Sequence, residues 1–164
     1  MGKAAVKIPS DRPPSATRYE DDLFTWVQEQ VALLKSGRLD AIDACNIAEE
    51  LGDVGSEQYN KLESAIAIVC QHILKWDHQP SRRSRSWQLS IRSHRARIRS
   101  VLDDNPGLKS RIGQAMTRGY RYGRDRALDE TGLTDDAMPE ICPFTFEDLL
   151  DREFVIAPRP RRKR

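Results

Sequence analysis

The chain has 164 residues, of which 38% are hydrophobic and 32% are charged, and its formal net charge is +2. This length favours a single domain with one core, and the hydrophobic fraction is too high for a disordered protein. No run of 18 apolar residues occurs, so we expect neither a transmembrane helix nor a membrane partner. Three widely spaced cysteines lack the spacing of a metal site. They favour reduced thiols in a cytoplasmic protein and predict no metal or other cofactor.

The charge alternates in blocks along the chain. Residues 18–63 carry four basic and eleven acidic residues, residues 75–126 carry fourteen and four, and residues 127–154 carry one and nine. The last six residues, 159–164, include five basic ones. Because blocks of opposite sign attract one another, the basic block has two candidate partners, an acidic segment of the same chain or an external anion.

The first helix is expected at about residues 19–36, after a flexible arm at residues 1–17. Thr17 and Glu20 have the spacing of a capping box, and Gly37 is a typical helix stop. The apolar positions at helical spacing are Leu23, Val27, Val31 and Leu34, with Phe24 and Trp26 beside them.

Asp40 is expected to cap a second helix, and Gly52 and Gly55 are expected to loosen its end. A third helix then begins near Ser56 and contains the uncharged run 64–74, which is apolar on most sides. A helix of this kind is usually the central one of a bundle.

Two further helices are expected at residues 81–104 and 107–130, and Thr145 with Asp148 predicts a short helix at residues 146–150. No segment shows the period of two that is typical of strands. The expected fold is therefore an all-α helical bundle of about five main helices plus a short C-terminal helix.

This bundle is expected to form one domain at residues 18–154, followed by a basic tail at residues 155–164. The tail ends in "RPRRKR", which suits contact with nucleic acid or an anionic surface. A solvated chain end is the commoner use of such a sequence.

Seven arginines lie between Arg82 and Arg99 with no acidic residue among them. Successive residues of a helix are turned by 100°, so one side of this helix is expected to carry Arg85, Arg92, Arg95 and Arg99. Like charges in such a row repel. A row of arginines that is kept despite this repulsion indicates that the guanidinium groups have anionic partners. The candidate binding surface consists of Lys75, Arg82, Arg83, Arg85, Arg92, Arg95 and Arg99.

Three kinds of partner fit these arginines: acidic side chains of the second helix, phosphates of a nucleic acid, or an acidic protein. We favour the internal partner, from the group Asp43, Glu49, Glu50 and Asp53. The specific expectation is an ion pair that joins Glu49 or Glu50 to Arg82, Arg85 or Arg92.

A polar cluster is expected where the second, third and fourth helices meet, formed by Glu49, Glu50, His72 and Gln79 beside Lys75. Adjacent helical residues point about 100° apart, so Glu49 and Glu50 do not form a catalytic dyad. The sequence has no Glu-x-x-His pair, no HExxH and no glycine-rich phosphate loop. An enzyme that uses Glu49 or Glu50 with His72 and Lys75 is therefore the minority interpretation, and a hydrogen-bonded core histidine is the commoner one.

Several segments together resemble the bacterial domain of unknown function 29 family. They are "YEDDLFTW" (19–26), "GRLDAIDACNIAEEL" (37–51), "HILKWDHQPSRRSRSW" (72–87), "ETGL" (130–133) and "CPFTFEDLLD" (142–151). The resemblance covers about residues 18–154, and it implies an all-helical fold in a prokaryotic intracellular protein. It implies no activity.

We therefore expect a non-enzymatic binding or interaction module that uses the arginine-rich helix face. Its partner is an unidentified protein or a nucleic acid, and its oligomeric state is left open. Nucleic-acid binding predicts an affinity that falls steeply with salt. A protein partner predicts an exposed apolar patch of more than a few hundred Å².

Overall fold

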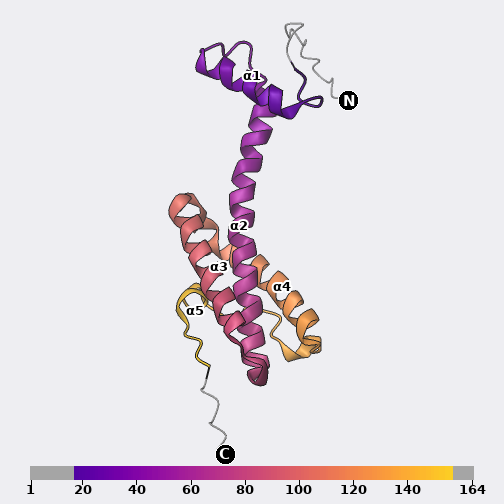
Figure 1. The fold of residues 1–164 in the computed structure, drawn as a ribbon, viewed down its shortest axis with the longest axis vertical. Helices are drawn as coiled ribbons and strands as arrows, with labels where there is room; N and C mark the ends of the chain where they lie inside the picture. Colours follow the sequence, from indigo (N-terminus) through magenta and orange to yellow (C-terminus); the bar gives the residue numbers. More distant parts are fainter. Residues whose placement is uncertain (1–16, 157–164) are drawn as a thin grey trace, which may run out of the picture. The chain divides into compact units, whose positions relative to one another are not determined.

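A computed structural model describes residues 17–156, and the predictions for residues 1–16 and 157–164 fall outside the described residues. The described part contains helices and turns and no strand, so the all-α helical bundle is confirmed. The helices, labelled in Figure 1, are α1 (Leu23–Lys35), α2 (Ala44–His78), α3 (Arg85–Asp104), α4 (Ile112–Thr131) and α5 (Phe146–Asp151). Short 3₁₀ turns lie at Pro80–Arg82, Pro106–Arg111 and Asp135–Ala137.

The predicted second and third helices form one helix, α2, so four main helices precede the short α5 rather than five. Gly52 and Gly55 do not end the second helix; both lie inside α2 without a positive φ. Glycine weakens a helix by about 1 kcal/mol relative to alanine but, unlike proline, keeps the backbone N–H that donates along the helix. The predicted turn near Ser56 is therefore wrong.

The start of α1 also differs from the prediction. The helix begins at Leu23, and the carboxylate of Asp22 accepts hydrogen bonds from the backbone N–H and the hydroxyl of Thr25, at 3.1 and 2.6 Å. The predicted capping box of Thr17 and Glu20 is not formed among the described residues. An aspartate at the N-cap satisfies a backbone N–H that the helix leaves without a partner.

Three other helix ends follow the sequence. Gly37 (φ +72°) and Gly132 (φ +67°) adopt the left-handed conformation just after α1 and α4, a conformation that favours glycine. Thr145 and Asp148 form the predicted capping box at the start of α5.

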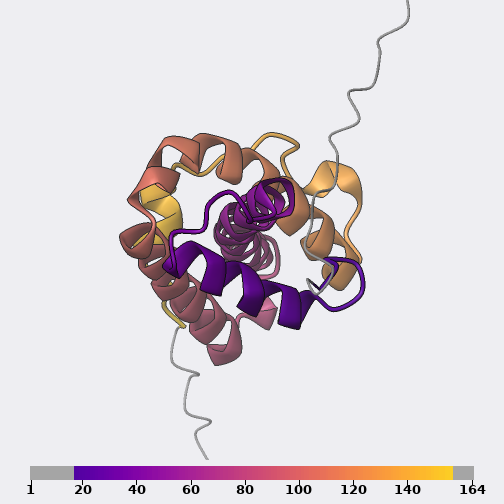
Figure 2. The same ribbon diagram turned by 90° about the horizontal axis from the view of Figure 1, so that it is seen from above.

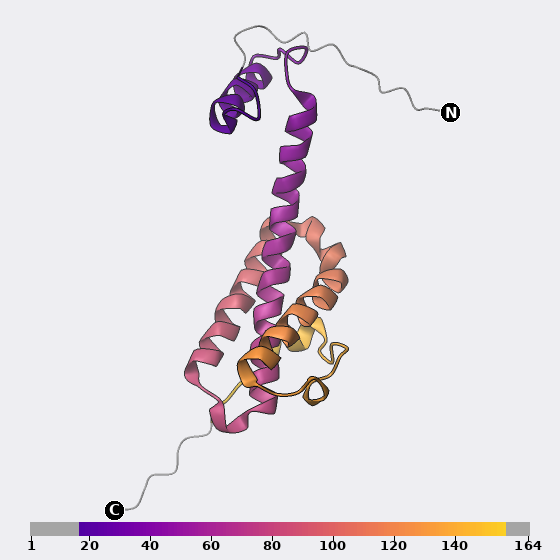
Figure 3. The same ribbon diagram turned by 90° about the vertical axis from the view of Figure 1, so that its right-hand side faces the viewer.

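The chain divides into two compact units, and the boundary in the sequence falls between Val54 and Gly55. We refer to residues 17–54 as the N-terminal unit and to residues 55–156 as the C-terminal unit. Within the C-terminal unit, the view along α2 shows α3, α4 and α5 arranged around it (Figure 2), and α3 and α4 flank it on two sides (Figure 3). The prediction that the run 64–74 lies in a central helix is confirmed, because most of its side chains are buried.

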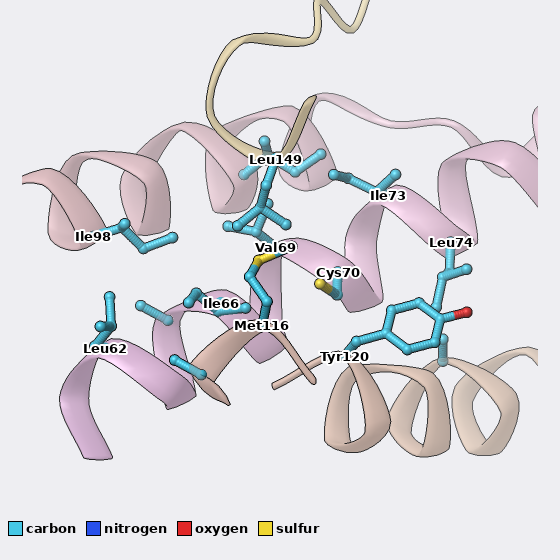
Figure 4. Close-up of a cluster of buried hydrophobic side chains, with 14 of the residues drawn as sticks. Leu62, Ile66, Val69, Cys70, Ile73, Leu74, Ile98, Met116, Tyr120 and Leu149 are labelled. Atoms are coloured by element: carbon cyan, nitrogen blue, oxygen red, sulfur yellow. The ribbon is translucent and has the colours of Figure 1, made fainter. Parts of the chain in front are cut away.

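The core of the C-terminal unit joins all four of its helices. Leu62, Ile66 and Ile73 of α2 are 0% exposed and belong to one buried cluster with residues of α3, α4 and α5 (Figure 4). The residues drawn and labelled in Figure 4 are Leu62, Ile66, Val69, Cys70, Ile73, Leu74, Ile98, Met116, Tyr120 and Leu149.

Helices α2 and α4 approach closely at two glycines. A Cβ atom on Gly123 would lie 2.4 Å from the carbonyl oxygen of Ala67, and one on Gly119 would lie 2.7 Å from Cγ2 of Ile66. Neither position has room for a side chain, so this pair of glycines sets the distance between the two helices.

Candidate functional site

Two arginines of α3 from the candidate surface bind the C-terminal end of α5. Arg95 donates hydrogen bonds to the backbone oxygens of Leu149 (2.6 Å), Arg152 (2.8 Å) and Asp148 (3.2 Å). Arg99 donates to the carbonyl of Leu150 (3.1 Å) and forms an ion pair with Asp151 (2.8 Å). The last carbonyls of a helix lack partners within the helix and carry partial negative charge, which the two guanidinium groups satisfy.

Arg83 is also held within the C-terminal unit. Its Nε donates to the backbone oxygen of Trp76 at 2.9 Å, and its guanidinium group lies 5.2 Å from the Trp76 ring centroid. These contacts connect the start of the basic segment to the end of α2.

Lys75 is buried rather than available at a surface, with 7% of its area exposed. Its ammonium group forms an ion pair with Glu130 of α4 and lies 4.6 Å from the Trp87 ring centroid. The side chain of Gln71 donates to the other carboxylate oxygen of Glu130 at 2.8 Å. The hydrogen bond from Lys75 holds the pKa of Glu130 below its ordinary value.

Arg82, Arg85 and Arg92 of the candidate surface are exposed, and within residues 17–156 their side chains make no hydrogen bond or ion pair. Arg85 and Arg92 are seven residues apart on α3 and share one side, with Leu89 between them at 52% exposure. We call these three arginines the free arginine face.

The predicted ion pair from Glu49 or Glu50 to the arginine segment is wrong for the described residues. Glu50 accepts a hydrogen bond from the Tyr19 hydroxyl at 2.6 Å within the N-terminal unit, and this bond raises the pKa of Tyr19 to about 12. The prediction required a turn between the second and third helices, and α2 continues through that point. The acids that do pair with the basic block include Glu130, Asp135 and Asp151 from the block 127–154. Glu63, at the end of the block 18–63, pairs with Arg118.

The predicted polar cluster is only partly assembled. His72 and Gln79 lie in the C-terminal unit, whereas Glu49 and Glu50 belong to the N-terminal unit. Gln79 donates to the carbonyl of Thr131 at 3.4 Å.

His72 is half-buried, its ring centroid is 6.4 Å from that of Trp87, and its Nδ1 atom is buried without a hydrogen-bond partner among the described residues. Burial, and then the charge of Lys75, lower the pKa of His72 to about 4. The imidazole is therefore neutral at neutral pH. The carboxylate nearest the Lys75 ammonium group is Glu130, which sequence reasoning missed. The quoted "ETGL" segment, which begins with it, was the available signal.

The N-terminal unit is held together mainly by polar contacts. Among residues 17–54, the buried side chains are Trp26 and Gln30. The Tyr19 ring meets the Trp26 ring edge-on at 5.0 Å, and the Gln30 side chain accepts a hydrogen bond from the backbone N–H of Asp43 at 2.8 Å. The Asp43 carboxylate accepts from Asn46 in the first turn of α2, the role that the sequence assigned to Asp40.

The apolar row of α1 faces solvent. The exposed fractions are 47% for Leu23, 75% for Phe24, 37% for Val31 and 44% for Leu34. At 100° per residue these four positions lie within about 100° of one another, so they form one continuous side of the helix. We call these four residues the apolar face of α1. Leu39, Leu51 and Val54 of the same unit are also more than half exposed.

A cleft of about 590 Å³ lies in the C-terminal unit, and no predicted site residue lines it. Its lining consists of Arg124, Asp135, Asp136, Met138, Pro139 and Glu140. Arg124 is already bonded to the side chain and carbonyl of Asp135, so its charge is not available to an incoming anion.

These features define a small all-α protein with a well-packed C-terminal unit and an N-terminal unit whose helix presents apolar side chains to solvent. The chain belongs to the family described as domain of unknown function DUF29, whose model matches residues 18–155. This match confirms the resemblance seen in the sequence. No curated protein and no solved structure matches the chain.

Between residues 17 and 156, no helix combines the length and hydrophobicity needed to cross a bilayer. The same residues contain no group of three or more His, Cys, Asp or Glu side chains placed to hold a metal ion.

Proposed function

We propose that the protein is a non-enzymatic interaction module that binds a basic, amphipathic protein segment through its N-terminal unit. The observation that carries this proposal is the apolar face of α1, exposed on a unit with an excess of acidic residues. The bacterial cytoplasm that the family resemblance implies is the setting in which we place this interaction.

The apolar face of α1 supports binding because its exposure is costly in free energy. Burial of one large apolar side chain from water contributes about 1.5–3 kcal/mol, and Phe24 alone is 75% exposed. Contiguous apolar patches of more than a few hundred Å² on a protein surface mark interaction sites. The N-terminal unit buries Trp26 and Gln30 of its own, which is too little for a core, so burial against a partner would complete it.

The charge of the N-terminal unit favours a basic partner. Residues 17–54 contain three basic and nine acidic side chains. A second copy of this unit would bring the same excess of acids, and like charges around an apolar contact oppose association. A segment with lysines or arginines around an apolar stripe complements both the face and its surroundings.

The free arginine face supports a second candidate function, binding of a nucleic-acid backbone. Three guanidinium groups without partners can each contact a phosphate in a bidentate manner. Because four of the seven predicted contacts are engaged within the chain, the expected salt dependence is modest. Release of counterions from three phosphates predicts an affinity loss of about fortyfold between 50 and 200 mM salt.

Experiments that capture binding partners on the full chain, with and without nuclease, distinguish the two candidate functions. The wild type is compared with Phe24→Ser and with Leu89→Ser, which removes an exposed apolar side chain from the C-terminal unit. We expect a basic protein to be retained by the wild type and by Leu89→Ser, to be lost with Phe24→Ser, and to be unaffected by nuclease.

Other outcomes overturn the proposal. Equal loss of the captured protein with both variants would show that the apolar face of α1 is not the contact. Loss of the captured protein after nuclease treatment would favour nucleic-acid binding by the free arginine face. The double variant Arg85→Met, Arg92→Met would then abolish the capture. A dimer in light scattering that becomes a monomer with Phe24→Ser would replace the basic partner by a second copy.

A further inference from the structure

Two of the three cysteines lie together in the C-terminal unit. Cys70 is 0% exposed in α2, and Cys142 is half-buried in the segment between α4 and α5. Both thiols are free, and Cys142 packs against the buried cluster that contains Cys70. Cys45, the third, is exposed in the N-terminal unit. Seventy-two positions separate these two cysteines in the sequence, so the fold alone brings them to one cluster.

The residues on both sides of Cys142 are anchored to Tyr120 of α4. The Tyr120 hydroxyl donates a hydrogen bond to the carbonyl of Pro139, and the Phe144 ring meets the Tyr120 ring edge-on at 6.1 Å. Tyr120 itself belongs to the buried cluster that contains Cys70 (Figure 4). This anchoring holds the segment that carries Cys142 against the cluster that contains Cys70.

The two thiols differ in reactivity. The neighbouring Cys70 thiol lowers the pKa of Cys142 to about 7. The Cys142 thiol and burial both raise the pKa of Cys70. The thiolate is the nucleophilic form of cysteine, so Cys142 is the reactive member at neutral pH. It is also the more accessible of the two.

We propose that Cys142 and Cys70 form a peroxide-sensitive thiol pair that closes to a disulfide between α2 and the segment before α5. In the first step the Cys142 thiolate attacks the terminal oxygen of a hydroperoxide. The O–O bond breaks, the leaving alkoxide or hydroxide takes up a proton, and Cys142 is oxidised by two electrons to a sulfenic acid.

In the second step the sulfur of Cys70 attacks the sulfur of Cys142. The S–S bond forms, the S–O bond breaks, and the hydroxyl group leaves as water with the proton of the Cys70 thiol. In total, two thiols and one hydroperoxide give one disulfide, one alcohol or water molecule from the peroxide, and one further water molecule. Reduction by a small thiol reverses the change.

Hydrogen peroxide added to the reduced full-length protein at neutral pH tests this proposal. Alkylation of the remaining thiols, followed by peptide mass mapping, measures the oxidation of each cysteine. We expect a Cys70–Cys142 disulfide to form within one molecule, with Cys142 consumed about tenfold faster than Cys45, because about half of the Cys142 thiol is ionised at neutral pH.

Two variants identify the order of the steps. Cys45→Ser should leave the rate and the product unchanged. Cys70→Ala should stop the reaction at a sulfenic acid on Cys142, which a dimedone probe traps. Oxidation of Cys142 no faster than that of Cys45, or disulfides between molecules alone, would overturn the proposal. Wild-type mapping decides the question even if Cys70→Ala fails to fold.

Discussion

The two units of this protein use their apolar residues in opposite ways. In the C-terminal unit, 17 buried residues form one cluster that joins α2, α3, α4 and α5. In the N-terminal unit, Trp26 is the buried apolar residue among residues 17–54, while α1 presents its apolar face to solvent. A regular apolar row on a helix therefore establishes the helix, but it does not establish whether the row meets the chain's own core or a partner.

The same contrast holds for charge. The basic residues of the C-terminal unit are largely engaged within the unit, by carbonyl groups at the end of α5 and by acids such as Glu130 and Asp151. Several acids of the N-terminal unit, including Glu20, Glu49 and Asp53, are exposed and have no such partner among the described residues. The more strongly charged segment in the sequence is thus the more internally satisfied one.

The largest expected effect is on the core of the C-terminal unit. Ile73→Ala removes a side chain that is 0% exposed and should cost about 2–5 kcal/mol, because it leaves a cavity between packed helices. Leu34→Ala, on the apolar face of α1, is the matched control and should change stability by less than about 0.5 kcal/mol. Urea unfolding measures both. Equal losses would mean that the apolar face of α1 is buried in the protein as it exists in solution.

A smaller effect is expected for an arginine of α3. Arg95→Met removes three hydrogen bonds to the end of α5 and should cost about 1–2 kcal/mol, with increased proteolysis near Arg152. Arg85→Met, from the free arginine face, removes no such contact and serves as the control. If both variants unfolded at the same urea concentration, the distinction between engaged and free arginines would be wrong.

The acid sensitivity of the C-terminal unit should depend on His72. The pKa of His72 is lowered to about 4 in the folded protein, against about 6.5 in an unfolded chain. Between these values the unfolded chain binds the proton and the folded one does not, so stability falls as the pH falls from about 6.5 to 4 and His72 causes no further loss below that. Because His72 is only half-buried, the loss is about 1–2 kcal/mol.

His72→Gln should flatten the stability profile across this pH range, whereas His78→Gln, at an exposed position, should leave it unchanged. Thermal unfolding midpoints at half-unit pH steps measure the effect. A wild-type profile that is already flat between pH 4 and 6.5 would show that His72 is solvated in the folded protein.

Local sequence rules predicted much of the fold. The uncharged run 64–74, Gly37 and the Thr145–Asp148 pair predicted a central helix, a helix end and a cap, because each depends on residues a few positions apart. The contact of Gly123 with Ala67 and the ion pair of Lys75 with Glu130 join residues more than fifty positions apart. Charge and composition are compatible with many such long-range pairings and do not determine which one forms. The predicted polar cluster therefore combined residues that belong to different units.

The smallest expected effect concerns the glycine that misled the helix prediction. Gly52→Ala should stabilise the first part of α2 by about 0.5–1 kcal/mol, because its φ is not positive and no heavy atom lies within 4 Å of the added Cβ. Amide hydrogen exchange of residues 48–54 should slow by about two- to fivefold, while the core amides near Ile73 stay unchanged. Gly52→Pro supplies the opposite change, since proline removes a backbone donor and breaks a helix at a cost of about 3 kcal/mol. Faster exchange with alanine at this position would mean that the chain turns between Gly52 and Ser56, as the sequence had suggested, and that the two units do not share a helix.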